Sequence, residues 1–263
     1  MADILTRIVQ TKTEAVAAAR LRVPEAELKA MAADRDSKRP FTENLRQAHV
    51  QGGTGIIAEI KRASPSRGII RADLDPADCA AKYEAGGAAA ISVLTDAPYF
   101  KGSLSDLKQA RKACSLPVLR KEFILSDYQV YESAAAGADA VLLIVRILTQ
   151  TMLSDLIGLC RALGLDTLVE IHDENDLEAA TNAGAKLIGI NNRNLKTFKT
   201  DIAVATRLVS DFGPDQVPVA ASGIGSREDI GRTKAAGIHN FLIGESLVRA
   251  KDTVSFLKQL LTD

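Results

Sequence analysis

The chain of 263 residues contains no Trp, has only three Cys and carries no net charge, because 33 Lys and Arg balance 33 Asp and Glu. Without a basic excess, no overall field attracts nucleic acid or an anionic membrane surface. We therefore expect no nucleic-acid partner and no membrane partner, and an anionic ligand has to be held by a local site. The apolar fraction of 46% is ordinary for a globular protein and supplies ample material for a core.

The few cysteines argue against a disulfide framework. Cys79, Cys114 and Cys160 are odd in number and far apart, without CxxC spacing, which indicates small apolar fillers in a reducing compartment. The opening segment MADILTRIVQTK lacks an apolar signal core, and no window reaches 18 uninterrupted apolar residues. We expect a soluble cytoplasmic protein that acts as a monomer.

The signatures of several chemistries are also missing. His49, His172 and His239 have no metal-ligand spacing, so we expect them at the surface or the rim of a site, and we expect no metal. No GxSxG nucleophile elbow is present, Ser222 has no histidine arranged to activate it, and no GxGxxG fingerprint follows a strand. Serine nucleophiles, metal ions and dinucleotide cofactors therefore have no support in the sequence.

What the chain does contain is an internal repeat. The segments YEAGGAAAISVL, SAAAGADAVLLI, TNAGAKLIGI and KAAGIHNFLIG each end an amphipathic stretch on a glycine and then enter an apolar run. Their glycines, Gly86, Gly137, Gly184 and Gly237, lie about 50 residues apart, which is the length of two βα units. A glycine at that point suits the left-handed position that ends a helix.

Strands and helices alternate along the rest of the chain. The predicted strands are 56–60, 89–94, 117–121, 140–144, 166–171, 187–191, 217–222 and 240–244. The predicted helices are 76–85, 104–113, 127–136, 149–163, 173–183, 201–211, 226–236 and 246–261, the last broken near Asp252. Such alternation demands parallel strands with right-handed crossovers. It favours an α/β fold of the (β/α)8 TIM barrel type, and an open doubly wound sheet is the alternative.

The first 50 residues stand outside the repeat and have three helical patterns. We expect residues 1–50 to form an N-terminal helical extension packing on the barrel, and residues 51–263 to form the catalytic barrel. Such an extension can plug the bottom of a barrel, cover its active mouth, or simply pack against it.

Polar residues end at least five of the predicted strands, where a buried strand should stay apolar. They are Glu59 and Lys61, Lys121, Glu170, Asn191 and Arg193, and Ser222. A charged group at the rim of an apolar core costs several kcal/mol unless it is paired or hydrated. Since active sites of (β/α)8 barrels form at the carboxyl ends of the strands, these residues predict one shared site.

Alternation along the first strand places Glu59 and Lys61 on the same face. Lys121 follows Arg120, so one of the two faces the barrel interior and the other faces the helices. We expect Lys121 to be partly desolvated near other cations, which disfavours its ammonium and makes it a better proton donor. Glu170 is then a complementary base or a holder of a lysine. Structural ion pairs among these side chains are the alternative.

Glycine turns follow the seventh and eighth predicted strands. In SGIGSRED, Gly223 lets backbone N–H groups approach an anion, and Ser226 and Asp229 have the spacing of a capping box. Strand eight ends in IGES with Gly244, and Ser64 in the loop SPSRG supplies a hydroxyl near the same mouth. Together they predict a phosphate site, and acid–base chemistry on a phosphorylated small molecule is the function that remains.

These residues lie in blocks that resemble the indole-3-glycerol-phosphate synthase family over almost the whole chain. The blocks are IIAEIKRASPSRG, ISVLTD with YFKGSL, PVLRKEFIL, YQVYESAAAGADAVLLI, LVEIHDENDLEAA, LIGINNRNLKTF, ASGI and FLIGESLVRA. The resemblance implies a (β/α)8 barrel with a helical extension over the site. It also implies a cofactor-free reaction in which 1-(2-carboxyphenylamino)-1-deoxyribulose 5-phosphate closes a ring and loses carbon dioxide and water.

The resemblance also implies roles for individual residues. Lys121 is the general acid of ring closure, and Lys61 binds the anionic substrate and is a candidate donor in dehydration. Glu59 and Glu170 are the carboxylates, with the identity of the base left open. Asn191 and Ser222 hydrogen-bond the reacting portion. The phosphate is held by Ser64, Gly223, Gly244 and the backbone of Glu245, with charge from Arg193 and Lys61. The pocket for the aromatic ring is shaped by Phe100, Phe123, Leu142 and Leu195.

One departure from the family pattern matters, because the chain has ASGI where family members usually have ESGI. Ala221 therefore replaces an acid beside Ser222. An active synthase is one hypothesis, and a barrel that binds the same ligand with impaired catalysis, natural or engineered, is the second. A third is another phosphosugar enzyme, such as a lysine-dependent aldolase or an isomerase.

Overall fold

A computed structural model describes residues 4–34, 38–194 and 197–262. Within these ranges, eight parallel strands close into a barrel in the order β1-β10-β9-β8-β7-β6-β5-β4, with β4 pairing back to β1. The strands are β1 (Gly55–Ile60), β4 (Ala90–Leu94), β5 (Val118–Lys121), β6 (Ala140–Ile144), β7 (Asp166–Ile171), β8 (Leu187–Asn191), β9 (Val217–Ala221) and β10 (Asn240–Ile243). The predicted barrel is confirmed, and the open-sheet alternative is wrong.

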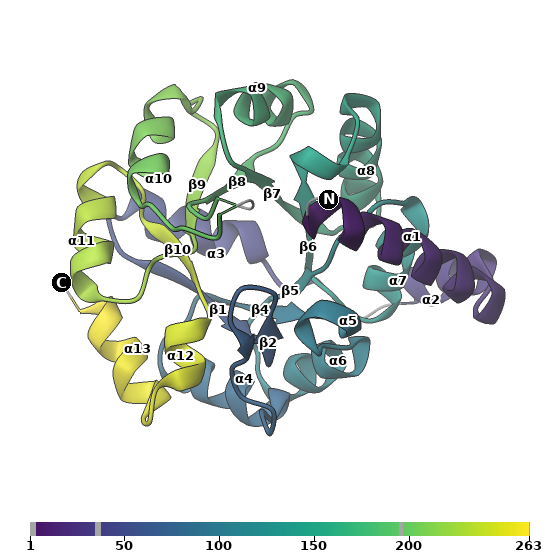
Figure 1. The fold of residues 1–263 in the computed structure, drawn as a ribbon, viewed down its shortest axis with the longest axis horizontal. Helices are drawn as coiled ribbons and strands as arrows, with labels where there is room; N and C mark the ends of the chain where they lie inside the picture. The colour runs from purple at the N-terminus through teal and green to yellow at the C-terminus, as the bar shows by residue number, and fades with distance from the viewer. Residues whose placement is uncertain (1–3, 35–37, 195–196, 263) are drawn as a thin grey trace.

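Helices surround the strands in the view down the barrel (Figure 1). They are α4 (Pro76–Ala85), α6 (Leu104–Ala113), α7 (Asp127–Ala135), α8 (Gln150–Ala162), α9 (Glu174–Asn182), α10 (Ala203–Leu208), α11 (Arg227–Ala235), α12 (Glu245–Arg249) and α13 (Thr253–Leu261). The predicted break near Asp252 is confirmed, because Asp252 caps α13 by accepting from Ser255 N. Short 3-10 segments, η1 (Val145–Ile147) and η2 (Val209–Asp211), complete this layer.

Three features of the mouth were not predicted. A short hairpin of β2 (Ala63–Ser64) and β3 (Gly68–Ile69) follows β1, and α5 (Ala97–Phe100) follows β4. Strand β9 also ends one residue earlier than predicted, because Ser222 adopts a left-handed conformation with φ of 67°, which a strand cannot continue.

The glycine prediction needs one correction in the first repeat. Gly137, Gly184 and Gly237 have positive φ as expected, but in the first repeat Gly87 takes the left-handed conformation and Gly86 does not. Gly86 is small for a different reason, since a Cβ there would lie 2.7 Å from a methyl carbon of Leu257 on α13.

The alternation of each strand separates two cores. Outward side chains such as Ile56, Ala58 and Ile60 pack in the layer under the helices. Inward side chains such as Ile57 and Leu119 form a second cluster inside the barrel. The parity of β1 therefore points Glu59 into the barrel, a direction that alternation alone left open.

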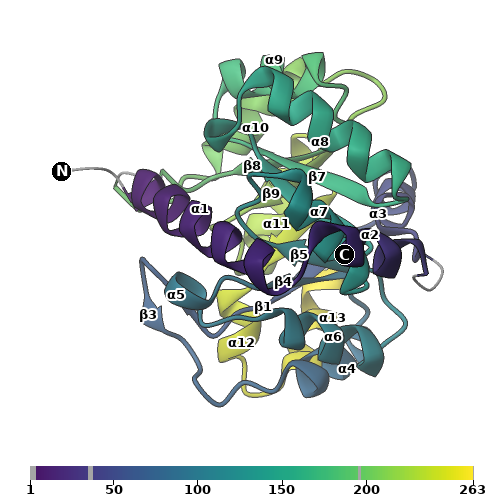
Figure 2. The same cartoon turned by 90° about the vertical axis from the view of Figure 1, so that its right-hand side faces the viewer.

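The N-terminal helices α1 (Ile4–Arg22), α2 (Glu25–Ala33) and α3 (Phe41–Val50) occupy both ends of the barrel. Phe41 and Leu45 of α3 are fully buried in the inner cluster, so α3 plugs the bottom. Figure 2 shows α1 on the opposite side, with β3 and α5. The loop before α3 is tied to the strand starts, because Asp166 accepts from Thr42 N at 2.9 Å and Asp139 accepts from Arg39 N at 2.9 Å.

The cysteines behave as the sequence suggested, since Cys79, Cys114 and Cys160 are all buried free thiols. Burial raises the pKa of the Cys160 thiol to about 12. In the part of the chain that the structure describes, no helix combines the length and the apolarity needed to cross a membrane.

Candidate active site

The carboxyl ends of the strands surround a cavity of about 620 Å³. All of the predicted site residues within the described ranges line it, and Leu195 lies outside the described residues. The lining residues among them are Glu59, Lys61, Ser64, Phe100, Lys121, Phe123, Leu142, Glu170, Asn191, Arg193, Ser222, Gly223, Gly244 and Glu245. Residues separated by up to 186 positions therefore meet at one mouth, where the fold predicts an active site.

Four charged side chains form the centre of the site. Glu59 Oε1 lies 2.5 Å from Lys61 Nζ, and Glu59 Oε2 lies 3.6 Å from Lys121 Nζ. Lys121 Nζ also lies 3.9 Å from Glu170 Oε2. The Glu59 side chain is only 3% exposed, so its charge is stabilised by the lysines and not by water. The arrangement is an alternating series of two ammonium groups and two carboxylates at the ends of β1, β5 and β7.

The charge balance of the site corrects the expectation for Lys121. Burial works against its ammonium, but the carboxylates of Glu59 and Glu170 outweigh that effect and hold the pKa of Lys121 above its usual value. Burial also opposes ionisation of Glu59, yet Lys61 and Lys121 outweigh it and keep the pKa of Glu59 below its usual value. The ammonium of Lys121 is therefore stabilised rather than disfavoured.

The neighbour of Lys121 faces the other way. Arg120 Nη1 donates to Gln129 O at 3.1 Å and to Ser133 Oγ at 3.0 Å, both on α7. Its guanidinium thus lies in the helical layer, 4% exposed. The register that the sequence left open therefore directs Lys121 into the cavity.

Strand β8 and the loop after β9 add neutral polar groups. Asn191 Nδ2 donates to Glu170 Oε1 at 3.1 Å, and Asn191 Oδ1 accepts from Arg193 N at 3.0 Å. Ser222 is held in its left-handed conformation where its carbonyl accepts from Asn192 Nδ2 at 3.1 Å. Non-glycine residues in this conformation concentrate at functional sites. Ala221, which pairs with Asn191 in the β8–β9 register, lines the cavity beside Ser222.

The predicted phosphate side contains both glycine turns. Ser226 and Asp229 form a full capping box at the start of α11, as expected. Gly244 packs directly against Glu59, because a Cβ there would lie 2.5 Å from Glu59 Oε1. The Glu245 carboxylate points toward arginines, with Arg249 Nε at 3.1 Å and Arg67 Nε at 3.3 Å.

The loop after β1 is tied across the mouth to the loop after β8. Arg193 Nη1 donates to Ser66 Oγ, and Ser64 Oγ lies 3.4 Å from the Ser66 hydroxyl. Sequence reasoning missed Ser66, Arg67 and Arg249 as lining residues. For Arg249 a signal existed, since it stands four residues after Glu245 on one helical face.

An apolar wall lies across the mouth from the glycine turns, because the strand order puts β5 and β6 opposite β9 and β10. Phe100 and Phe123 form its aromatic part, with ring centroids 6.1 Å apart, and Leu142 adds to it. Three lining residues from α1, missed by sequence reasoning, extend the wall: Ile4, Leu5 and Ile8. Their helical spacing was the available signal.

His172 is a second correction, because it is not a surface or rim residue. It is 9% exposed, and its ring lies between Glu170 Oε1 at 3.8 Å from Nε2 and Asp176 Oδ2 at 3.6 Å from Nδ1. His49 and His239 instead pack on each other, with ring centroids 5.5 Å apart. Over residues 4–34, 38–194 and 197–262, no group of three His, Cys, Asp or Glu side chains is placed to hold a metal ion.

Comparison with known proteins identifies relatives of the whole chain. Residues 5–260 match the family described as indole-3-glycerol phosphate synthase. The chain belongs to this family. A protein named indole-3-glycerol phosphate synthase from Desulfosudis oleivorans is 95% identical over 262 residues, covering 100% of both chains. A second protein of that name, from Syntrophobacter fumaroxidans, is 48% identical and covers 99% of this chain and 98% of its own.

A likeness among solved structures concerns the fold alone. The structure of a thiamine phosphate pyrophosphorylase from Pyrococcus furiosus superimposes with a TM-score of 0.58 at 15% identity, over 80% of this chain and 94% of that one. A shared barrel hosts many unrelated reactions, so this likeness says nothing of the chemistry. The two synthases, by contrast, match over 98% or more of their length.

Proposed function

We propose that this chain is an indole-3-glycerol-phosphate synthase whose reaction is carried by Glu59, Lys61, Lys121 and Glu170. The enzyme is a carboxy-lyase of tryptophan biosynthesis that acts on a phosphorylated small molecule. The observation that carries the assignment of residues is the placement of Lys121 Nζ within 4 Å of two carboxylates inside the cavity, at 3.6 and 3.9 Å.

In the proposed mechanism, Lys121 protonates the ketone oxygen of the substrate as the aromatic carbon attacks the carbonyl carbon. The new carbon–carbon bond closes the ring, and the carboxylate of the ring then leaves as carbon dioxide. Loss of the protonated hydroxyl as water, with removal of a ring proton, gives the indole. Lys121 suits the first step because Glu59 and Glu170 keep it charged until the ketone oxygen develops negative charge.

Lys61 stands beside Glu59 and has two candidate tasks: binding the anionic substrate and donating the proton for dehydration. Glu59 and Glu170 are the two candidates to accept the proton from the newly closed ring. Glu170 is also held by Asn191 Nδ2 at 3.1 Å, which fixes its carboxylate, whereas Glu59 is held by two lysines. Asn191 and Ser222 are proposed to orient the reacting portion.

The two ends of the cavity match the two ends of the substrate. The phosphate lies against Ser64, Gly223, Gly244 and the backbone of Glu245, with Arg193 supplying charge, and the aromatic ring lies against Phe100, Phe123 and Leu142. We further propose that residues 1–50 are an extension on the barrel of 51–263 that takes part in the site, because Ile4, Leu5 and Ile8 complete the apolar wall.

A steady-state assay tests the function directly. Purified chain given 1-(2-carboxyphenylamino)-1-deoxyribulose 5-phosphate should produce indole fluorescence, and Lys121→Ala should lower kcat by about 10²–10⁴-fold while binding inorganic phosphate as before. An equal loss of phosphate affinity would contradict the role of Lys121. No turnover at high enzyme concentration would refute an active synthase.

The absence of an acid at Ala221 favours one alternative, a barrel that binds the substrate with impaired catalysis. Calorimetry with a reduced substrate analogue separates the two, because tight binding without turnover supports the alternative. The Schiff-base reading is disfavoured, since a lysine must lose its proton to attack a carbonyl and the carboxylates stabilise the charged Lys121. Borohydride in the presence of substrate should therefore trap no covalent adduct.

A further inference from the structure

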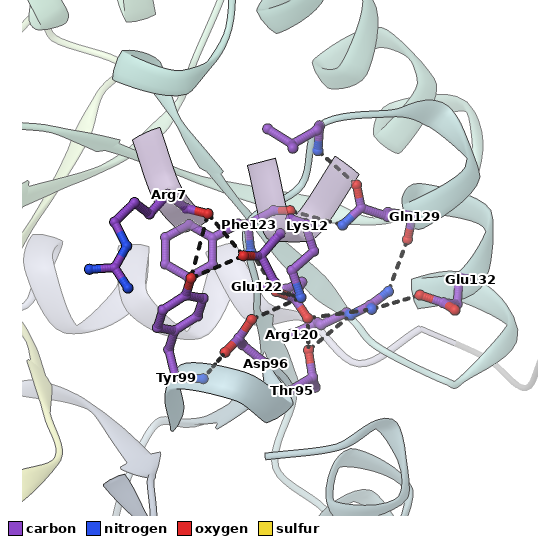
Figure 3. A network of polar contacts seen from close by, with 12 residues as sticks. Arg7, Lys12, Thr95, Asp96, Tyr99, Arg120, Glu122, Phe123, Gln129 and Glu132 are labelled. Atoms are coloured by element: carbon purple, nitrogen blue, oxygen red, sulfur yellow. Dashed lines mark hydrogen bonds and ion pairs between the residues drawn. The ribbon is translucent and has the colours of Figure 1, made fainter. Parts of the chain in front are cut away.

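A lysine buried behind the cavity draws three elements together. Lys12 of α1 is 8% exposed and does not line the cavity. Its Nζ lies 2.9 Å from Asp96 Oδ2 and 2.9 Å from Glu122 Oε1 (Figure 3). Asp96 precedes α5, and Glu122 follows Lys121 at the end of β5. Burying an ammonium and two carboxylates costs desolvation free energy, so we ask which function this arrangement serves.

Each carboxylate also holds a segment that carries an aromatic ring of the cavity wall. Asp96 Oδ1 caps α5 by accepting from Tyr99 N at 2.8 Å, and the next residue is Phe100. Glu122 Oε1 accepts from Phe123 N at 2.9 Å, while Oε2 accepts from Thr95 Oγ1 at 2.9 Å. The backbones of Phe100 and Phe123 are thus positioned by the two acids that Lys12 bridges.

The same helix, α1, also supplies the part of the apolar wall that we call the α1 roof. Ile4, Leu5 and Ile8 line the cavity one to two turns before Lys12. A second link from α1 reaches α5, because the hydroxyl groups of Thr11 and Tyr99 lie 3.0 Å apart. The position of the roof relative to the two aromatic rings is therefore set by contacts around Lys12.

Removing the ammonium would leave the two carboxylates without the cation between them in a dry environment, with Asp96 fully buried and Glu122 4% exposed. Arg120 Nη2 would still lie 3.8 Å from Glu122 Oε2, so Asp96 would be the more destabilised of the two acids. Although burial lowers the pKa of Lys12, Glu122 and Asp96 outweigh that effect and raise it above its usual value. Lys12 is therefore charged at neutral pH and bridges the two acids.

We propose that Lys12 is a positioning residue for the aromatic-ring end of the substrate, setting the wall formed by Phe100, Phe123 and the α1 roof. The proposal rests on the proposed function, because it assigns that wall to the ring. This role concerns only the aromatic-ring end of the cavity, because the glycine turns after β9 and β10 and the charged centre are held by other contacts. Loss of Lys12 should weaken recognition of the ring and leave the phosphate end intact.

The test compares Lys12→Met with Lys12→Arg in the full chain. In the methionine variant we expect KM for the substrate to rise by about tenfold or more, kcat to change by less than about threefold, and the inhibition constant of inorganic phosphate to stay unchanged. The arginine variant keeps the charge and should restore most of the affinity. Lys29→Met removes an exposed lysine of the same extension, paired with Glu25, and should change none of these values.

A double variant covers the case in which Lys12→Met folds poorly. Lys12→Met with Asp96→Asn removes one of the stranded charges while an asparagine can still cap α5, so it should recover folding and part of the KM. An unchanged KM in a folded Lys12→Met, or equal losses for substrate and phosphate, would overturn the proposal. Turnover by the unmodified chain is measured in the same experiment. If the unmodified chain shows no turnover, the proposed function fails. If it does turn over, an unchanged KM in Lys12→Met or equal losses for substrate and phosphate refute only the role of Lys12.

Discussion

Gly244 offers the sharpest test of how the site is built, because a single methyl group there would press on Glu59. The glycine is buried at the end of β10, and its φ of −128° does not itself require glycine. A Cβ at this position would lie 2.5 Å from Glu59 Oε1 and 3.2 Å from Glu59 Cβ and Cδ. Since unstrained contacts with carbon begin at about 3.5 Å, the carboxylate has to move away by about 1 Å.

That retreat is resisted by the ion pairs of Glu59, which lies 2.5 Å from Lys61 and 3.6 Å from Lys121. A misplacement of about 1 Å in a catalytic group can cost about 10²-fold in rate. We therefore expect Gly244→Ala to lower kcat by about 10²-fold. The added volume should also lower the free energy of unfolding by about 1–3 kcal/mol.

Steady-state kinetics and urea unfolding measure these two effects separately. The matched control is Gly231→Ala on the exposed face of α11, where an added Cβ meets nothing within 4 Å; it should raise the free energy of unfolding by about 0.5–1 kcal/mol and leave turnover unchanged. If Gly244→Ala keeps kcat within about twofold, or raises only KM, the contact with Glu59 does not position a catalytic carboxylate.

Three further outcomes are expected. Ala221→Glu should raise kcat if the missing acid limits catalysis, and an unchanged kcat would remove Ala221 as the cause of impairment. Phe41→Ala should lower the free energy of unfolding by about 3–5 kcal/mol in urea, because Phe41 is fully buried in the inner core; a loss below about 1 kcal/mol would mean that α3 is not a plug. Although burial raises the pKa of Asp229, hydrogen bonds from Gly225 and Ser226 outweigh it and lower that pKa. The stability from Asp229 is therefore present above its ordinary pKa of 3.8 and is lost as the pH falls through the lower folded-state value. Asp229→Asn should thus cost about 1 kcal/mol at pH 7, and the difference from the unmodified chain should vanish in acid; a gap independent of pH would contradict the charge effect.

Local patterns in the sequence sufficed for the barrel, since each strand and helix is encoded by short-range periodicity and glycine punctuation. The same patterns located the polar strand ends, because a charged residue such as Glu59 in an apolar run stands out without any coordinates. The family blocks added roles that periodicity cannot supply. The predicted strand 217–222 was one residue too long, because Ser222 adopts a left-handed conformation that periodicity does not reveal.

Contacts between distant segments were decided only by the folded chain. The charge state of Lys121 depends on Glu59 and Glu170, which lie 62 and 49 positions away, so reasoning from neighbouring cations predicted the wrong direction. The burial of His172 and the bridge from Lys12 to Asp96 and Glu122 are likewise invisible to periodicity. Electrostatic energies depend on distance in space and on exclusion of water. The sequence by itself therefore determined which residues end the strands, and only the tertiary structure decided which of their charges stabilise one another.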